Sequence, residues 1–168
     1  MSCRALVIAL CLTIPTVGSA QNASGKQSLE GVWKTVEVVT TGANATTIRN
    51  PQPNLVIFTK GHYSQLAVLG DQPRPQFEPA TDPTKLTDTE KIARYEQWSL
   101  FAANAGTYEV KGTTLIRRPL VAKNETVMAK NSSLEGEFKL EGNTLWITTK
   151  SVPGQPAGET RAKLKRVE

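Results

Sequence analysis

Apolar and polar residues alternate along most of the chain after residue 30, in short runs separated by glycine-containing turns. An alternation with a period of two is typical of a β-strand that buries one face. The pattern predicts a first strand over residues 31–41, three hairpins over 54–69, 106–115 and 136–145, and a last strand over 160–167. Strands that follow one another in this way indicate an all-β fold, an antiparallel barrel or sandwich.

Two of these hairpins are similar in sequence. "GTYEVKGTTL" starts at Gly106 and "GEFKLEGNTL" starts 30 residues later, with glycine, aromatic, aliphatic and leucine residues at equivalent places. Glycine readily adopts a positive φ, so we expect tight turns at Lys111-Gly112 and Glu141-Gly142. Lys60-Gly61 predicts the same kind of turn in the first hairpin.

One segment has a helical period instead. In "LTDTEKIARYEQWSLFAANAG", Thr87 followed by Glu90 predicts a capping box, and Gly106 comes just after the segment's predicted end. The proline-rich residues 70–83 before it predict an exposed loop. We expect a helix that closes an end of the barrel or covers its wall.

The turns assign side chains to faces. In the second hairpin Tyr108, Val110 and Leu115 form the apolar set, so Arg117 faces inward with them and Arg118 faces outward. The third hairpin places Phe138, Leu140, Leu145 and Ile147 inside and Trp146 outside. An arginine inside a barrel needs a partner, because a buried unpaired charge is costly.

Glu37 is a candidate partner for Arg117. If Trp33 is internal, a period of two places Thr35, Glu37 and Val39 on the same inner face. The opposite orientation buries Val32, Val36 and Val38 and leaves Glu37 in solvent. Valines occupy both faces, so the sequence leaves both orientations open.

His62 is the single histidine of the chain. If Lys60-Gly61 is aligned with Lys111-Gly112, then His62 and Ser64 face the lumen with Leu66 and Val68, and Phe58 and Tyr63 face outward. A partly exposed hairpin histidine is the simpler interpretation of His62. No Gly-x-Ser-x-Gly motif accompanies Ser64, so we predict no catalytic residue from this pair.

The first twenty residues predict a signal peptide. Arg4 precedes a short apolar run, and small residues precede the expected cleavage after Ala20. We therefore expect a secreted or periplasmic protein, with a flexible start over residues 21–28 and one barrel domain over 29–168. Cys3 and Cys11 both lie in the predicted leader.

Charge and composition bear on partners. The net charge of +5 is modest, and the basic residues of the last strand lack interleaved aromatics, so we expect no nucleic-acid partner. With one histidine, and no cysteine after the leader, we expect no metal and no cofactor. Apart from the leader, no apolar run approaches the length of a membrane span. The oligomeric state is left open.

Four motifs occur in order: "LEGVWKTVEVVTTG", "FTKGHYS", "AGTYEVKGTTL" and the final "LKRVE". Together they resemble the bacterial lipocalin-like domain family, which are calycin-type barrels. The resemblance implies an antiparallel up-and-down barrel of eight strands. It also implies that Trp33 plugs the closed end, with Arg166 laid over its ring.

The resemblance implies a binder of a small apolar or amphipathic molecule, and Arg117 would suit an anionic head group. The candidate ligand-binding residues are His62, Ser64, Tyr108, Leu115, Arg117, Phe138, Leu145 and Glu37. One alternative is a cyclase or isomerase that uses His62 or Glu37 as general acid or base. Another is an inhibitor or interaction module that presents the loop over residues 70–83.

Overall fold

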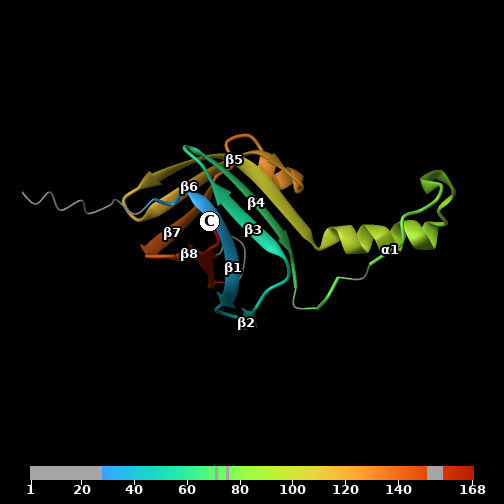
Figure 1. Ribbon diagram of the computed structural model, residues 1–168, viewed down its shortest axis with the longest axis horizontal. Coiled ribbons are helices and arrows are strands. Elements are labelled where there is room, and N and C mark those ends of the chain that lie inside the picture. The colour runs from blue at the N-terminus through green and yellow to red at the C-terminus, as the bar shows by residue number, and fades with distance from the viewer. Residues whose placement is uncertain (1–27, 71, 75, 151–156) are drawn as a thin grey trace, which may run out of the picture.

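In the described part of the chain, nine antiparallel strands form one sheet that closes on itself. Figure 1 shows the ribbon of this computed structural model. The structure describes residues 28–70, 72–74, 76–150 and 157–168. The strands are β1 (Gly31–Thr40), β2 (Thr46–Arg49), β3 (Asn54–Phe58), β4 (His62–Val68), β5 (Phe101–Lys111), β6 (Thr114–Ala122), β7 (Leu134–Glu141), β8 (Thr144–Lys150) and β9 (Glu159–Arg166). Two 3₁₀ turns, η1 (Pro83–Lys85) and η2 (Glu125–Met128), and helix α1 (Asp88–Ser99) complete the described elements.

The order of the strands is that of an up-and-down barrel. From β3 to β9 each strand pairs with the next one in sequence, and β1 pairs with both β3 and β9. Among the described residues the ring therefore contains eight strands, each paired on both sides, which confirms the predicted fold class. The short β2, which the sequence pattern missed, pairs with β1 alongside the ring.

One edge of β1 is shared between β3 and β2. Residues Gly31 to Trp33 pair with β3, and Glu37 to Thr40 pair with β2. At the break, the side-chain amide of Asn54 replaces a backbone partner: its Oδ1 accepts from Thr35 N at 2.6 Å, and its Nδ2 donates to Thr35 O at 3.2 Å. The sheet edge thus stays hydrogen-bonded where it passes from one neighbour to the other.

Trp33 plugs one end of the barrel. Its side chain is fully buried, and its indole N–H donates to Leu29 O at 2.8 Å. The Arg166 guanidinium carbon lies 4.2 Å from the ring centroid, and the same group donates to the backbone oxygens of Ser28 and Glu30. The predicted Trp33–Arg166 stacking is confirmed.

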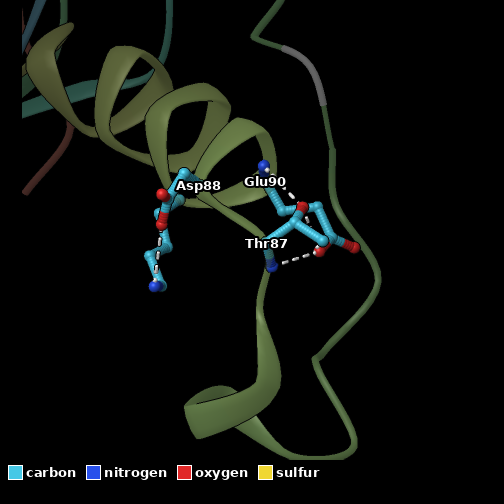
Figure 2. A network of polar contacts seen from close by, with 4 residues as sticks. Thr87, Asp88 and Glu90 are labelled. Atoms are coloured by element: carbon cyan, nitrogen blue, oxygen red, sulfur yellow. Dashed lines mark hydrogen bonds and ion pairs between the residues drawn. The ribbon is translucent and has the colours of Figure 1, made fainter.

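Helix α1 begins with the predicted capping box. Glu90 N donates to Thr87 Oγ1 at 3.3 Å, and Thr87 N donates to Glu90 Oε2 at 2.8 Å (Figure 2). Lys91 pairs with Asp88 beside it, at 3.1 Å. The two reciprocal bonds satisfy backbone donors that the first helical turn would otherwise leave free.

The position of α1 differs from the expectation. The helix ends at Ser99, because Phe101 already begins β5, and it projects away from the barrel (Figure 1). None of its residues is buried, so the prediction that it closes or covers the barrel is wrong. From the preceding loop, Phe77 lies under the guanidinium of Arg94, 5.3 Å from the ring centroid. The large apolar side chains of the helix are each more than half exposed.

Residues 1–27, including the predicted signal peptide and both cysteines, lie outside the described residues. No helix in the described part of the chain is long and apolar enough to span a membrane.

Removing the Arg166 guanidinium should destabilise the barrel. Arg166→Met loses the stacking on Trp33 and two charge-assisted hydrogen bonds, so we expect the free energy of unfolding to fall by about 2–4 kcal/mol. Urea denaturation followed by tryptophan fluorescence measures this change. Arg161→Met, at an exposed position of the same strand, is the matched control and should cost under about 0.5 kcal/mol. Equal losses for both variants would contradict the closing role of Arg166.

Candidate functional site

A cavity of about 340 Å³ occupies the barrel beyond the Trp33 plug. Most of its surface is apolar, and it is partly open to solvent. Its lining comes from seven strands, the β2–β3 connection and the residues just after β4: Thr35, Val38, Ile48, Pro51, Asn54, Val56, Gln65, Ala67, Val68, Leu69, Gly70, Arg117, Ile147, Thr149, Thr160, Ala162 and Leu164. Its volume lies at the lower end of the range for small-molecule pockets.

The rest of the interior is filled by side chains. Trp33, Phe58, Leu115, Leu145 and Leu164 are the largest fully buried residues, and they form one continuous cluster. An eight-stranded barrel is just wide enough for side chains to fill it, so a cavity remains only where the inward residues are small. Here the small inward residues include Ala67, Thr149 and Ala162.

Arg117 lies where the packed cluster meets the cavity. It faces inward opposite Tyr108 on β5 and is 8% exposed, whereas Arg118 is exposed and binds Glu109 at 2.6 Å. The predicted orientations of both arginines are confirmed. Arg117 Nη1 donates to Gln65 Oε1 at 2.6 Å, and its guanidinium carbon lies 5.7 Å from the centroid of the Tyr63 ring.

No acidic side chain among the described residues forms an ion pair with Arg117. Its Nε–H is buried and has no hydrogen-bond partner in the same part of the chain. Burial lowers the pKa of Arg117, and the neighbouring Tyr63 opposes that effect. Arginine stays protonated in proteins despite such a shift, so the cavity is next to a cation that is only partly satisfied.

Glu37 does not reach Arg117. A β-bulge between Thr35 and Glu37 inserts an extra residue into β1, so the inward positions pass from Thr35 to Val38. Glu37 therefore faces outward, with its carboxylate 3.8 Å from Arg49 Nε. Neither of the two expected orientations of this strand is correct along its whole length, because the bulge changes the face partway.

His62 and Ser64 also lie outside the lumen. The structure buries Phe58 and Tyr63 and leaves His62 exposed, which is the reverse of the predicted faces. Ser64 pairs with Ala105 and borders a shallow groove on the outer surface, together with Leu66. The prediction that His62 and Ser64 face the lumen is wrong, so their placement gives no support to the expected ligand contacts.

The error has a local cause in the turns. Gly112 and Gly142 are the first residues of their two-residue turns, since Lys111 pairs with Thr114 and Glu141 with Thr144. Gly61 instead is the second, because Thr59 N donates to His62 O at 2.9 Å around Lys60-Gly61. Aligning the glycines therefore shifts the first hairpin by one residue, and a shift of one residue exchanges the two faces.

In the other two hairpins, the predicted strand register differs from the observed register by two residues instead of one. If Lys111-Gly112 is taken as the two-residue turn, the expected partner of Tyr108 is Leu115, whereas the observed partner is Arg117, a displacement of two residues. Such a displacement preserves the faces, so Tyr108 and Leu115 point inward as expected, and so do Phe138 and Leu145.

These four residues belong to the core and not to the cavity. Leu115 and Leu145 are fully buried, Tyr108 packs edge-on against Phe58 with ring centroids 5.1 Å apart, and Phe138 packs against the same cluster. None of the four lines the cavity. Of the eight predicted ligand-binding residues, Arg117 alone is among those that line it.

Sequence reasoning missed several lining residues, notably Gln65, Ala67 and Val38. For Gln65 and Ala67, the sequence did contain a signal of their inward orientation, the aromatic residues Phe58 and Tyr63. Placing these aromatic side chains inside would have placed Gln65 and Ala67 inside as well, since residues two apart on a strand share a face. The bulge that turns Val38 inward has no comparable signal.

Comparisons with known proteins assign this chain to no family. No family model matches the chain, and no curated protein matches it. Among solved structures, a lipocalin-like protein from Bacteroides uniformis is similar at 16% identity and a TM-score of 0.44, covering 82% of this chain and 97% of that one. An uncharacterized protein from Bacteroides eggerthii is similar at 8% identity and a TM-score of 0.44, covering 83% and 99%.

The fold is a lipocalin-like barrel. This statement rests on the strand pairing of the chain itself, an up-and-down ring of eight strands closed by β1 and β9.

The buried hydroxyl of Tyr63 gives a test of the interior. This O–H has no hydrogen-bond partner within the described chain, and burial raises its pKa above the ordinary value of 10.0. Tyr63→Phe removes an unsatisfied polar group while keeping the ring under Arg117. We therefore expect it to raise the free energy of unfolding at pH 7 by about 1 kcal/mol.

The same variant should change the alkaline stability. Because the folded pKa of Tyr63 is raised, its contribution is complete below pH 10 and is lost as the pH rises toward the folded pKa. Tyr63→Phe should lose less stability above pH 10 than the wild type, measured by urea denaturation across that range. Tyr95→Phe, on the exposed helix, is the control and should change neither property. A loss of stability at pH 7 in Tyr63→Phe would show that the hydroxyl is satisfied.

Proposed function

We propose that this protein binds a small, largely apolar molecule in the lumen of its barrel. The observation that carries the proposal is the cavity of about 340 Å³, whose lining is mainly apolar, in an interior that is otherwise filled. Water gains little from hydrogen bonding in such a space, so an apolar molecule that displaces it binds favourably. The barrel needs no rearrangement to form the cavity.

The placement of His62 and Glu37 does not favour the cyclase or isomerase hypothesis. That hypothesis requires one of them as a general acid or base inside the pocket. His62 is exposed on the outer face, and Glu37 faces Arg49 outside the ring. Binding is therefore the function that the geometry supports best.

We further propose that binding takes place outside the cytoplasm. The support is the sequence of residues 1–20, a positive start, a short apolar run and small residues before Gln21. Expression of the full chain with a secretion-competent host should yield a protein whose amino-terminal residue is Gln21, read by intact mass and terminal sequencing. A protein that retains residue 1 and stays in the cytoplasm would contradict this.

Lumenal binding can be tested with the uncharged fluorescent probe N-phenyl-1-naphthylamine. Ala67 points into the cavity, so Ala67→Phe should fill part of it and weaken probe binding by about tenfold or more. Ala103→Phe is the matched control: Ala103 pairs with the outward-facing Leu66 on the neighbouring strand and should leave the affinity unchanged. Fluorescence titration gives both dissociation constants.

Thermal unfolding of the two variants shows that the fold is retained. If Ala67→Phe folds and binds the probe as tightly as the wild type, the probe does not occupy the lumen. Loss of binding in Ala103→Phe alone would instead place the probe on the outer surface.

A further inference from the structure

Among the described residues that line the cavity, Arg117 is the one with a charged side chain. Arg117 is 8% exposed and contributes to the cavity lining, so its charge is removed from bulk water but accessible from the lumen. An isolated ion in such a place is costly by several kcal/mol unless an opposite charge and further hydrogen bonds compensate it. Whatever compensates this charge has to lie within a few ångströms of it.

The described part of the chain supplies only part of that compensation. Gln65 accepts one hydrogen bond from Nη1 at 2.6 Å, and the Tyr63 ring lies 5.7 Å from the guanidinium carbon. Both groups are neutral at pH 7, and the Nε–H has no hydrogen-bond partner among the described residues. The nearby interior therefore offers dipoles and a ring face to the cation, but no counter-charge.

The identity of residue 65 is informative for this reason. A glutamate has almost the same shape as glutamine and would place a carboxylate where Gln65 Oε1 now accepts its bond. That carboxylate would neutralise Arg117 internally. With glutamine there, Gln65 holds the guanidinium in position and leaves its charge available.

A buried guanidinium whose neighbours are neutral is suited to binding a carboxylate. Its planar N–H groups form a fork that matches the two oxygens of a carboxylate, and such charge-assisted bonds are stronger than neutral ones. The mainly apolar walls around it are suited to a hydrocarbon body. The two features together describe an amphipathic molecule with one anionic end.

We propose that the lumenal ligand is an amphipathic carboxylate whose anionic end binds Arg117 and whose apolar body fills the cavity. This inference rests on the proposed function, since it specifies the chemistry of the ligand that the lumen holds. Arg117 supplies the charge, and Gln65 is a positioning residue that orients it.

The test compares decanoate with methyl decanoate, each measured by displacement of bound N-phenyl-1-naphthylamine at pH 7. The wild type should bind the carboxylate at least about tenfold more tightly than the ester, because only the carboxylate pairs with the guanidinium. Equal affinities in a protein that binds the uncharged probe would overturn this inference and leave the proposed function intact. Absence of probe binding would overturn the proposed function itself.

Gln65→Glu separates the charge from the shape of the site. It should abolish the preference for decanoate over the ester, because the carboxylate of residue 65 then pairs with Arg117 and repels a second carboxylate. It should also raise the midpoint of thermal unfolding, because Arg117 gains an internal counter-charge. A Gln65→Glu protein that keeps the preference for decanoate would contradict the assigned role of Arg117.

Arg117→Met should also abolish the preference, provided that the uncharged probe still binds and so reports an intact lumen. Arg118→Met is the matched control, since Arg118 is the adjacent residue but faces outward and pairs with Glu109. It should keep the full preference for decanoate. Loss of the preference in Arg118→Met would place the anion site on the outer surface.

Acetate and inorganic phosphate distinguish an amphipathic ligand from a free small anion. Neither should displace the probe or decanoate at concentrations where decanoate itself competes, since neither has an apolar body to fill the cavity. Displacement of decanoate by acetate at equal concentration would show that the site takes small anions and would overturn the amphipathic assignment.

Discussion

Pairing between β1 and β9 closes the ring, and the properties of the interior depend on this closure. The two strands are far apart in sequence, so their contact costs loop-closure entropy that the packed interior has to offset. Trp33 and Arg166 face each other across this seam in the pairing register and stack at its end. The seam and the plug of the barrel therefore involve the same pair of residues, which couples closure to core packing.

The bulge in β1 lies on the same seam and determines what the lumen contains. Before it, Trp33 and Thr35 point inward; after it, Val38 does, and Glu37 is directed to Arg49 outside. Without the bulge, Glu37 would face the lumen that Arg117 lines and could neutralise it. One additional residue in one strand thus keeps an acidic group out of the cavity and leaves Arg117 with neutral neighbours.

The barrel is divided into a filled half and a hollow half by side-chain size. Large residues cluster around Trp33, whereas alanine and threonine positions line the cavity. Arg117 lies at the boundary and contacts both halves through Tyr63 and Gln65. The filled half holds the guanidinium in position, and the hollow half gives a ligand access to it. Helix α1 contributes no buried residue to either half.

The period of two, the glycine turns and the capping box were sufficient to predict the strands of the ring and the helix start at Thr87. These features are local, or repeat along the chain, so sequence carries them directly. The pair Trp33–Arg166 was predicted from the family resemblance. Faces were predicted correctly for Arg117 and Leu115, because a register error of two residues leaves faces unchanged.

Only the tertiary structure decided the contents of the lumen. The position of Gly61 within its turn placed Tyr63 and Gln65 inside and His62 outside, and the bulge after Thr35 turned Glu37 away. The turn position of Gly61 and the bulge after Thr35 are both offsets of a single residue. Such an offset barely changes the hydrophobic pattern, but it exchanges the faces of all the residues that follow in the strand. The physical reason is that alternation along a strand defines two faces, and only packing against the rest of the ring determines which of them is the interior.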